Sequence, residues 1–190
     1  MTMMKTMKMR MRNFWPLLMA GSIGAMSVQA AIADEYQLLV GSYTAGQSQG
    51  IYRLNFDSAT GQIDAKPLQV IKSENPSWLT LSKDQRYLFV VNENGPGQRD
   101  PVGRVSSYAI APKTHELSLI NQVQSLGNEP THSSLSADAS HLFVSNYSVA
   151  EDPGGTLAVL PVSADGELKP VVQMSSHPAS RVNPERQMSS

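Results

Sequence analysis

The sequence contains no cysteine, so no disulfide can contribute to the stability of its fold. It also lacks an apolar run long enough to cross a membrane as a helix. The main apolar stretch, Phe14 to Met26, has 13 residues, whereas a spanning helix needs about 20. These absences exclude a disulfide-stapled mini-protein and predict a domain whose stability comes from packing.

The first 33 residues have the composition of an export signal. They hold four basic residues and no acid, and the apolar stretch is followed by the small-residue patterns Val28-Gln29-Ala30 and Ala31-Ile32-Ala33. We predict a Sec-type signal peptide over residues 1–33, cleaved after Ala30 or Ala33. The alternative, a membrane anchor, is disfavoured by the shortness of the apolar stretch. The mature protein is then periplasmic or secreted, with no stable membrane span after cleavage.

Basic charge is scarce in the remaining chain, residues 34–190. Of the 15 lysines and arginines four lie in the leader, so 11 remain against 16 acidic residues, a net charge of −5. A nucleic-acid-binding surface needs an excess of positive charge, so we expect no nucleic-acid partner.

Residues 34–190 read as an all-β domain. Short apolar strands alternate with turn signals, and no stretch shows a sustained helical period of 3.6 residues. The segment 75–93 (NPSWLTLSKDQRYLFVVNE) aligns with 129–147 (EPTHSSLSADASHLFVSNY) at an offset of 54, with Pro, Leu, Ser, Asp, Leu-Phe-Val and Asn coinciding. This similarity indicates an internal structural repeat.

Each repeat predicts four short strands in about 50 residues, which is typical of a β-propeller blade. A glycine leads one strand of every unit, and a hairpin turn precedes the last. The glycines are Gly50, Gly103 and Gly155. The chain carries about three units, and the first begins at 36–41, which aligns with 87–92, the second strand of the next unit. We therefore expect the first blade to lack its inner strand and expect self-association through unclosed blade edges.

Several motifs resemble the lactonase family of seven-bladed propellers, which contains bacterial 6-phosphogluconolactonase and is similar to fungal carboxymuconate-cyclising enzymes. The resemblance runs in order from about Tyr36 to Gln187. Its main motifs are Gly41-Ser42-Tyr43-Thr44, Asn75-Pro76-Ser77-Trp78-Leu79, Gly103-Arg104-Val105-Ser106-Ser107-Tyr108, Pro130-Thr131-His132-Ser133 and Val182-Asn183-Pro184-Glu185-Arg186-Gln187.

The resemblance implies that residues 34–190 are a truncated propeller, about three blades of an expected seven. It also implies hydrolysis of a small-molecule lactone by water attack in the complete form. An export signal fits an unphosphorylated periplasmic lactone at least as well as a phosphorylated cytoplasmic one. The alternative is a non-catalytic binding scaffold or an inactive remnant.

Two residues are candidates for catalysis. His132 matches the family's histidine motif at the start of an inner strand, where an imidazole can accept a proton from water or return one to a leaving alkoxide. The alternative is a structural histidine in a loop. Arg186 matches the Asn-Pro-Glu-Arg-Gln motif and would hold an anionic group or the developing oxyanion. Its spacing from the preceding hairpin breaks the register of the repeat, so it also fits a loop insertion.

Two further residues are candidates for substrate binding. Trp78 occupies the slot of His132 in the previous repeat and would form an aromatic wall beneath a sugar ring, or else be buried as packing. Glu93 follows the second strand of its unit and would be a polar contact, or else a solvated loop carboxylate.

Other motifs are set aside. Ser48 lies in a Gly-x-Ser-x-Gly pattern, but a strand pattern follows it, whereas a nucleophile elbow requires a helix. The four histidines show no metal-ligand spacing, so the sequence implies no metal and no cofactor. The tight turns at Asp84-Gln85 and Asp138-Ala139 lack the glycine usual in the family. Either these positions are left-handed and strained, or the turn is of type I and tolerates them.

Overall fold

The computed structural model describes residues 35–148 and 155–176, so the predicted leader and Arg186 lie outside it. The described residues form twelve strands, and none of them belongs to a helix that could cross a membrane. The strands are β1 (Glu35–Gly41), β2 (Gly50–Asp57), β3 (Gln62–Ile63), β4 (Gln69–Lys72), β5 (Pro76–Leu81), β6 (Tyr87–Asn92), β7 (Arg104–Ile110), β8 (Leu117–Gln124), β9 (Asn128–Leu135), β10 (His141–Ser148), β11 (Leu157–Pro161) and β12 (Gln173–Ser175).

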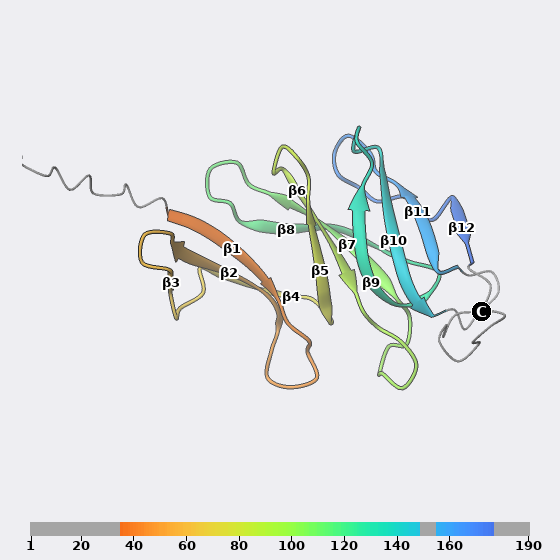
Figure 1. Cartoon of the computed structure of the whole chain (residues 1–190), viewed down its shortest axis with the longest axis horizontal. Helices are drawn as coiled ribbons and strands as arrows, with labels where there is room; N and C mark the ends of the chain where they lie inside the picture. Colours follow the sequence, from red (N-terminus) through yellow and green to blue (C-terminus); the bar gives the residue numbers. More distant parts are fainter. Residues whose placement is uncertain (1–34, 149–154, 177–190) are drawn as a thin grey trace, which may run out of the picture. The chain divides into compact units, whose positions relative to one another are not determined.

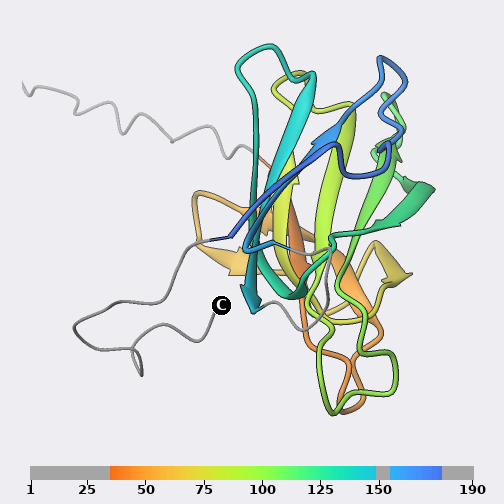
Figure 2. The same ribbon diagram turned by 90° about the vertical axis from the view of Figure 1, so that its right-hand side faces the viewer.

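These strands make three antiparallel sheets of four strands (Figure 1). Blade 2 has the order β5-β6-β7-β8, and blade 3 has the order β9-β10-β11-β12. In blade 1, β1 pairs with β2, which in turn pairs with both β3 and β4. In Figure 2 the strands of blade 3, in cyan and blue, lie toward the viewer. The prediction of an all-β fold built from four-stranded blades is confirmed.

Blade 1 begins at the second strand position, as the repeat predicts. Strand β1 pairs with β2 in the way that β6 pairs with β7, and among the described residues no strand pairs with the other edge of β1. The innermost strands of blades 2 and 3, β5 and β9, lie against each other. Their edges are therefore where side chains of neighbouring blades meet.

Strand β6 is apolar at successive positions because both of its faces are covered. Leu88 and Val90 pack in one cluster with Ile51 of blade 1, whereas Phe89 and Val91 pack in another with apolar residues of β10 and β11. These four apolar side chains of β6 are almost fully buried. Alternate residues of a strand point to opposite faces, so this sequence joins blade 2 to a neighbour on each side.

The tight turn between β9 and β10 repeats the one between β5 and β6. The hydroxyl of Ser136 donates to the carboxylate of Asp138 at 2.6 Å, and this bond, with those from the backbone and hydroxyl of Ser140, lowers the pKa of Asp138 to about 2. The next residue, Ala139, has φ 58°, and its equivalent Gln85 has φ 57°. Of the two alternatives left open by the sequence, the structure has the left-handed one.

This backbone predicts that Ala139→Gly stabilises the protein by about 0.5–1 kcal/mol. A left-handed residue with a Cβ costs about 1–2 kcal/mol, and the greater freedom of glycine in the unfolded chain cancels part of the gain. Urea unfolding of the purified chain measures the change. Ala137→Gly is the matched control, because Ala137 lies in the same turn and is not among the residues with positive φ. We expect the control to lose stability, and a loss of equal size in Ala139→Gly would contradict the prediction.

Candidate functional site

The Pro-x-Trp and Pro-x-His stretches fold alike at the start of their inner strands. Pro76 pairs with Asn92 and Trp78 pairs with Val91, so the residue between them has no partner of its own on β6. In β9, His132 pairs with Ser145, and the register shifts in the same way before it. Such a β-bulge re-aims the side chain that follows it. The repeat therefore gives Trp78 and His132 the same structural slot in neighbouring blades.

The side chains of these two residues contact each other. The ring centroids of Trp78 and His132 are 4.5 Å apart, and the ring planes are inclined by 47°. The indole Nε1 of Trp78 donates to the carbonyl oxygen of Ser133 at 3.1 Å, which fixes the indole against blade 3. Trp78 nevertheless remains 42% exposed, and His132 is also exposed. The pair is thus held in place while parts of both rings stay accessible to a ligand.

For each of these two residues, the structure disagrees with one of the two positions that the sequence left open. Trp78 is not a buried packing residue, because the bulge leaves much of its ring at the surface. His132 does not lie in a loop, because it belongs to strand β9.

Glu93 lies just beyond the end of β6 and forms a different pair. Its carboxylate accepts a hydrogen bond of 2.7 Å from the hydroxyl of Tyr43, which lies in the loop between β1 and β2. This bond, then partial burial, and then the charges of Glu93 and Glu129 raise the pKa of Tyr43. The phenol therefore keeps its proton and donates a hydrogen bond to the carboxylate, which orients Glu93.

Asn75 holds the loops around this pair together. Its side-chain oxygen accepts hydrogen bonds from the backbone and hydroxyl of Thr44, at 3.0 and 3.1 Å. Its amide nitrogen donates to Asn94 at 2.9 Å and to Gln98 at 2.8 Å, and its carbonyl oxygen accepts from the backbone of Glu93 at 2.9 Å. Asn75 also has φ 39°, a conformation that asparagine tolerates better than most residues.

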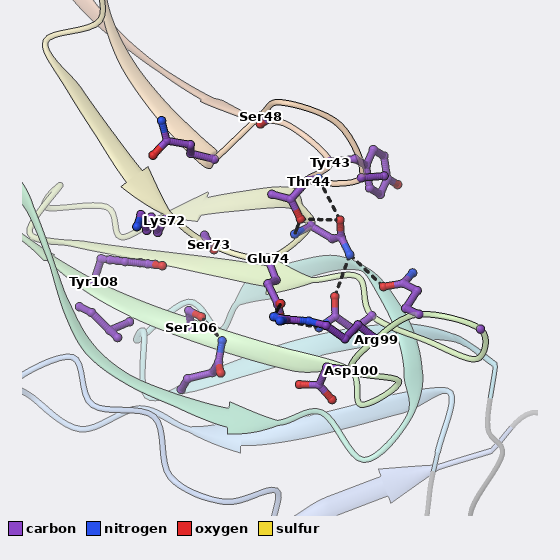
Figure 3. Close-up of a pocket in the computed structure, with 18 residues that line it drawn as sticks. Tyr43, Thr44, Ser48, Lys72, Ser73, Glu74, Arg99, Asp100, Ser106 and Tyr108 are labelled. Atoms are coloured by element: carbon purple, nitrogen blue, oxygen red, sulfur yellow. Dashed lines mark hydrogen bonds and ion pairs between the residues drawn. The ribbon is translucent and has the colours of Figure 1, made fainter.

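These loops border a polar cleft of about 900 Å³ between blades 1 and 2 (Figure 3). Tyr43 and Thr44 line one side of it, and the ion pair of Glu74 with Arg99, 2.9 Å long, lines another. Trp78 does not line this cleft. It borders a smaller groove of about 470 Å³ between β5 and β9.

The structure thus places the predicted site residues that it describes in two separate pairs. It brings Trp78 and His132 together and places Glu93 with Tyr43, while Arg186 lies outside the described residues. Neither Tyr43 nor Asn75 is among the site residues predicted from the sequence. A signal for Tyr43 was present in the repeat. Strand β1 is equivalent to β6, and Tyr43 follows β1 much as Glu93 follows β6.

Two other kinds of site considered from the sequence are a serine nucleophile at Ser48 and a metal site. Strand β2 follows the Gly-x-Ser-x-Gly pattern, and the hydroxyl of Ser48 bonds within its own loop, so the geometry of a nucleophile elbow is not present there. Within residues 35–148 and 155–176, no three histidine, aspartate or glutamate side chains gather into a group that could hold a metal ion.

Three antiparallel four-stranded sheets, with the innermost strands of blades 2 and 3 side by side, define part of a β-propeller. Residues 37–190 match the family model described as "Lactonase, 7-bladed beta-propeller", and the chain belongs to this family. The resemblance seen in the sequence is therefore confirmed.

The relatives include proteins named as lactonases. The chain is 30% identical over 138 residues to 6-phosphogluconolactonase of Bacillus subtilis, covering 73% of this chain and 36% of that protein. A solved structure of the periplasmic gluconolactonase of Pseudomonas aeruginosa is 53% identical with a TM-score of 0.74, covering 82% of this chain and 42% of that one. A putative 6-phosphogluconolactonase of Bacteroides uniformis is 32% identical with a TM-score of 0.67, covering 81% and 41%. The chain thus spans about two fifths of the length of these relatives.

Proposed function

We propose that this protein is an exported lactonase that hydrolyses a sugar lactone by attack of water on the ring carbonyl. The observation that carries the proposal is the contact between Trp78 and His132, two accessible rings held on neighbouring inner strands. Membership of the lactonase family supports the reaction class. The similarity of this chain to a periplasmic gluconolactonase, together with the predicted leader, supports a periplasmic location and an unphosphorylated lactone as substrate.

In this proposal His132 moves the protons. The neutral imidazole accepts a proton as the water oxygen bonds to the carbonyl carbon. The bond between that carbon and the ring oxygen then breaks, and the imidazolium returns the proton to the departing alkoxide. The product is an open-chain hydroxy acid, and the imidazole is neutral again.

The other site residues bind the substrate. One face of a sugar ring is apolar and packs against an aromatic ring, which is the role we give to Trp78. The carboxylate of Glu93, oriented by Tyr43, would accept hydrogen bonds from sugar hydroxyls. Arg186 would stabilise the oxyanion or bind an anionic group of the substrate.

A pH-stat measurement of acid release from glucono-δ-lactone and from 6-phosphogluconolactone tests the function. We expect the purified protein to hydrolyse the unphosphorylated lactone faster than buffer does. Binding of the lactone with no acceleration would refute catalysis and indicate a propeller that serves as a binding scaffold.

Replacing Trp78 tests its proposed role separately. We expect Trp78→Ala to raise KM for the lactone about tenfold with a smaller change in kcat, because loss of an aromatic contact and its buried area weakens binding by about 1.4 kcal/mol. Ile63→Ala is the control, since Ile63 is 52% exposed on β3 of blade 1 and lines neither the cleft bordered by Tyr43 nor the groove bordered by Trp78. Equal KM values for the two variants would exclude Trp78 from the substrate site.

A further inference from the structure

A second cavity between blades 1 and 2 lies at the opposite end of β5 from Glu93. Its volume is about 570 Å³, and its polar lining residues are Tyr36, Gln37, Arg53, Asp84, Gln85, Arg86 and His115. Strand β5 begins beside Glu93 and ends at Leu81, which borders this cavity. The cavity is therefore separate from the inner-strand pair and from the cleft bordered by Tyr43.

Arg53 is the unusual residue of this cavity, because its charge is buried without a counter-charge. The residue is only 6% exposed. Its Nη1 donates to the side-chain oxygen of Gln37 at 2.9 Å and to the carbonyl oxygen of Thr114 at 2.7 Å, and both acceptors are neutral. Its Nε is buried with no hydrogen-bond partner. Among the described residues, Arg53 forms no ion pair.

The neighbouring charges do not supply the missing partner. Asp84 accepts hydrogen bonds from the hydroxyl of Ser82 at 2.6 Å and from the backbone of Arg86 at 3.2 Å. Both donors lie in the turn between β5 and β6, so the carboxylate is held within that turn. Its other oxygen lies 3.9 Å from the guanidinium of Arg86. These two side chains offset each other, which leaves the charge of Arg53 unbalanced in the cavity wall.

A buried guanidinium whose Nε has no hydrogen-bond partner favours an oxyanion. Burial of an unpaired charge is unfavourable, and the planar fork of arginine matches the spacing of carboxylate or phosphate oxygens. The side chains of Gln37 and His115 add hydrogen-bond donors to the same wall. We propose that this cavity binds the carboxylate or phosphate group of a small molecule, with Arg53 as the principal contact.

Titration of the purified chain with inorganic phosphate, followed by calorimetry at constant ionic strength, tests the proposal. We expect saturable binding to one site, weakened at least tenfold in Arg53→Gln and unchanged in Arg99→Gln, which removes an exposed arginine of the other cleft. A parallel titration with acetate separates the two ligand chemistries: binding of acetate alone assigns a carboxylate, and binding of phosphate alone assigns a phosphate. Absence of binding by both anions would overturn the proposal, as would unchanged binding in Arg53→Gln.

Two further variants keep the test decisive if Arg53→Gln fails to fold. Arg53→Lys keeps the charge but loses the fork, and we expect it to bind the preferred anion severalfold more weakly. Asp84→Asn removes the negative charge from the wall, and we expect it to bind that anion severalfold more tightly. Wild-type affinity in both variants would overturn the proposal. Lactone hydrolysis is expected to stay unchanged in Arg53→Lys, so failure here is distinguishable from failure of the proposed function.

Discussion

We expect His132→Gln to lower kcat/KM for lactone hydrolysis by at least about 100-fold. Positioned acid–base groups contribute about 10²–10⁴-fold to such reactions, and glutamine cannot exchange a proton in the same way. His132 is exposed and its ring contacts that of Trp78 at the surface, so we expect the substitution to leave the fold intact. The measurement is the initial rate of acid release, taken beside a circular dichroism spectrum of the variant.

The control for this result is another histidine of blade 3. His141 begins β10, and its Nδ1 lies 2.8 Å from the hydroxyl of Ser140 in the turn before that strand. We expect His141→Gln to keep the activity of the wild type. If both variants lose less than about threefold, His132 does not transfer the proton, and the roles proposed for it must pass to another residue.

The repeat made the blades predictable from the sequence. Period-2 alternation and the offset of 54 residues locate strands, because each strand must bury the same faces in every blade. The same offset placed Trp78 and His132 in one slot, and their contact follows from the adjacency of equivalent positions in neighbouring blades.

Contacts between loops could not be predicted in this way. Tyr43 and Glu93 are 50 residues apart, and Asn75 bonds to Thr44 across 31 residues, with no shared local pattern. The alternation of β2 places Arg53 on the same face as Ile51, but only the packed structure shows that its nearest acceptors are neutral. The exposure of Trp78 also depends on the bulge, which a pattern of apolar residues does not reveal.

An asparagine at equivalent positions of the second strand in blade 2 and blade 3 carries the other large effect that we expect. Asn92 is fully buried at the end of β6. Its amide nitrogen donates to the hydroxyl of Ser73 at 3.0 Å and to the carbonyl of Glu74 at 2.5 Å. Its oxygen accepts from Ser106 at 2.7 Å and from Gln122 at 3.2 Å. One side chain thus links the segment after β4 of blade 1 to β7 and β8 of blade 2.

We therefore expect Asn92→Leu to lower the free energy of unfolding by about 3–4 kcal/mol. Leucine has a similar volume but leaves several buried polar groups without a partner, each at a cost of about 1–3 kcal/mol. Asn146, the equivalent residue 54 positions later, is the matched comparison. Its nitrogen donates to the carbonyls of Ser125 and Gly155, at 3.3 and 2.8 Å, but its oxygen is buried with no partner.

Replacing Asn146 by leucine removes an unsatisfied oxygen together with two hydrogen bonds, so the loss should be smaller, about 1–2 kcal/mol. Urea unfolding of the two variants under the same conditions measures the difference. A larger loss in Asn146→Leu would show that the number of hydrogen bonds does not determine stability at this position. A double-mutant cycle of Asn92 with Ser106 would then isolate the bond between blade strands, for which we expect a coupling of about 1 kcal/mol or more.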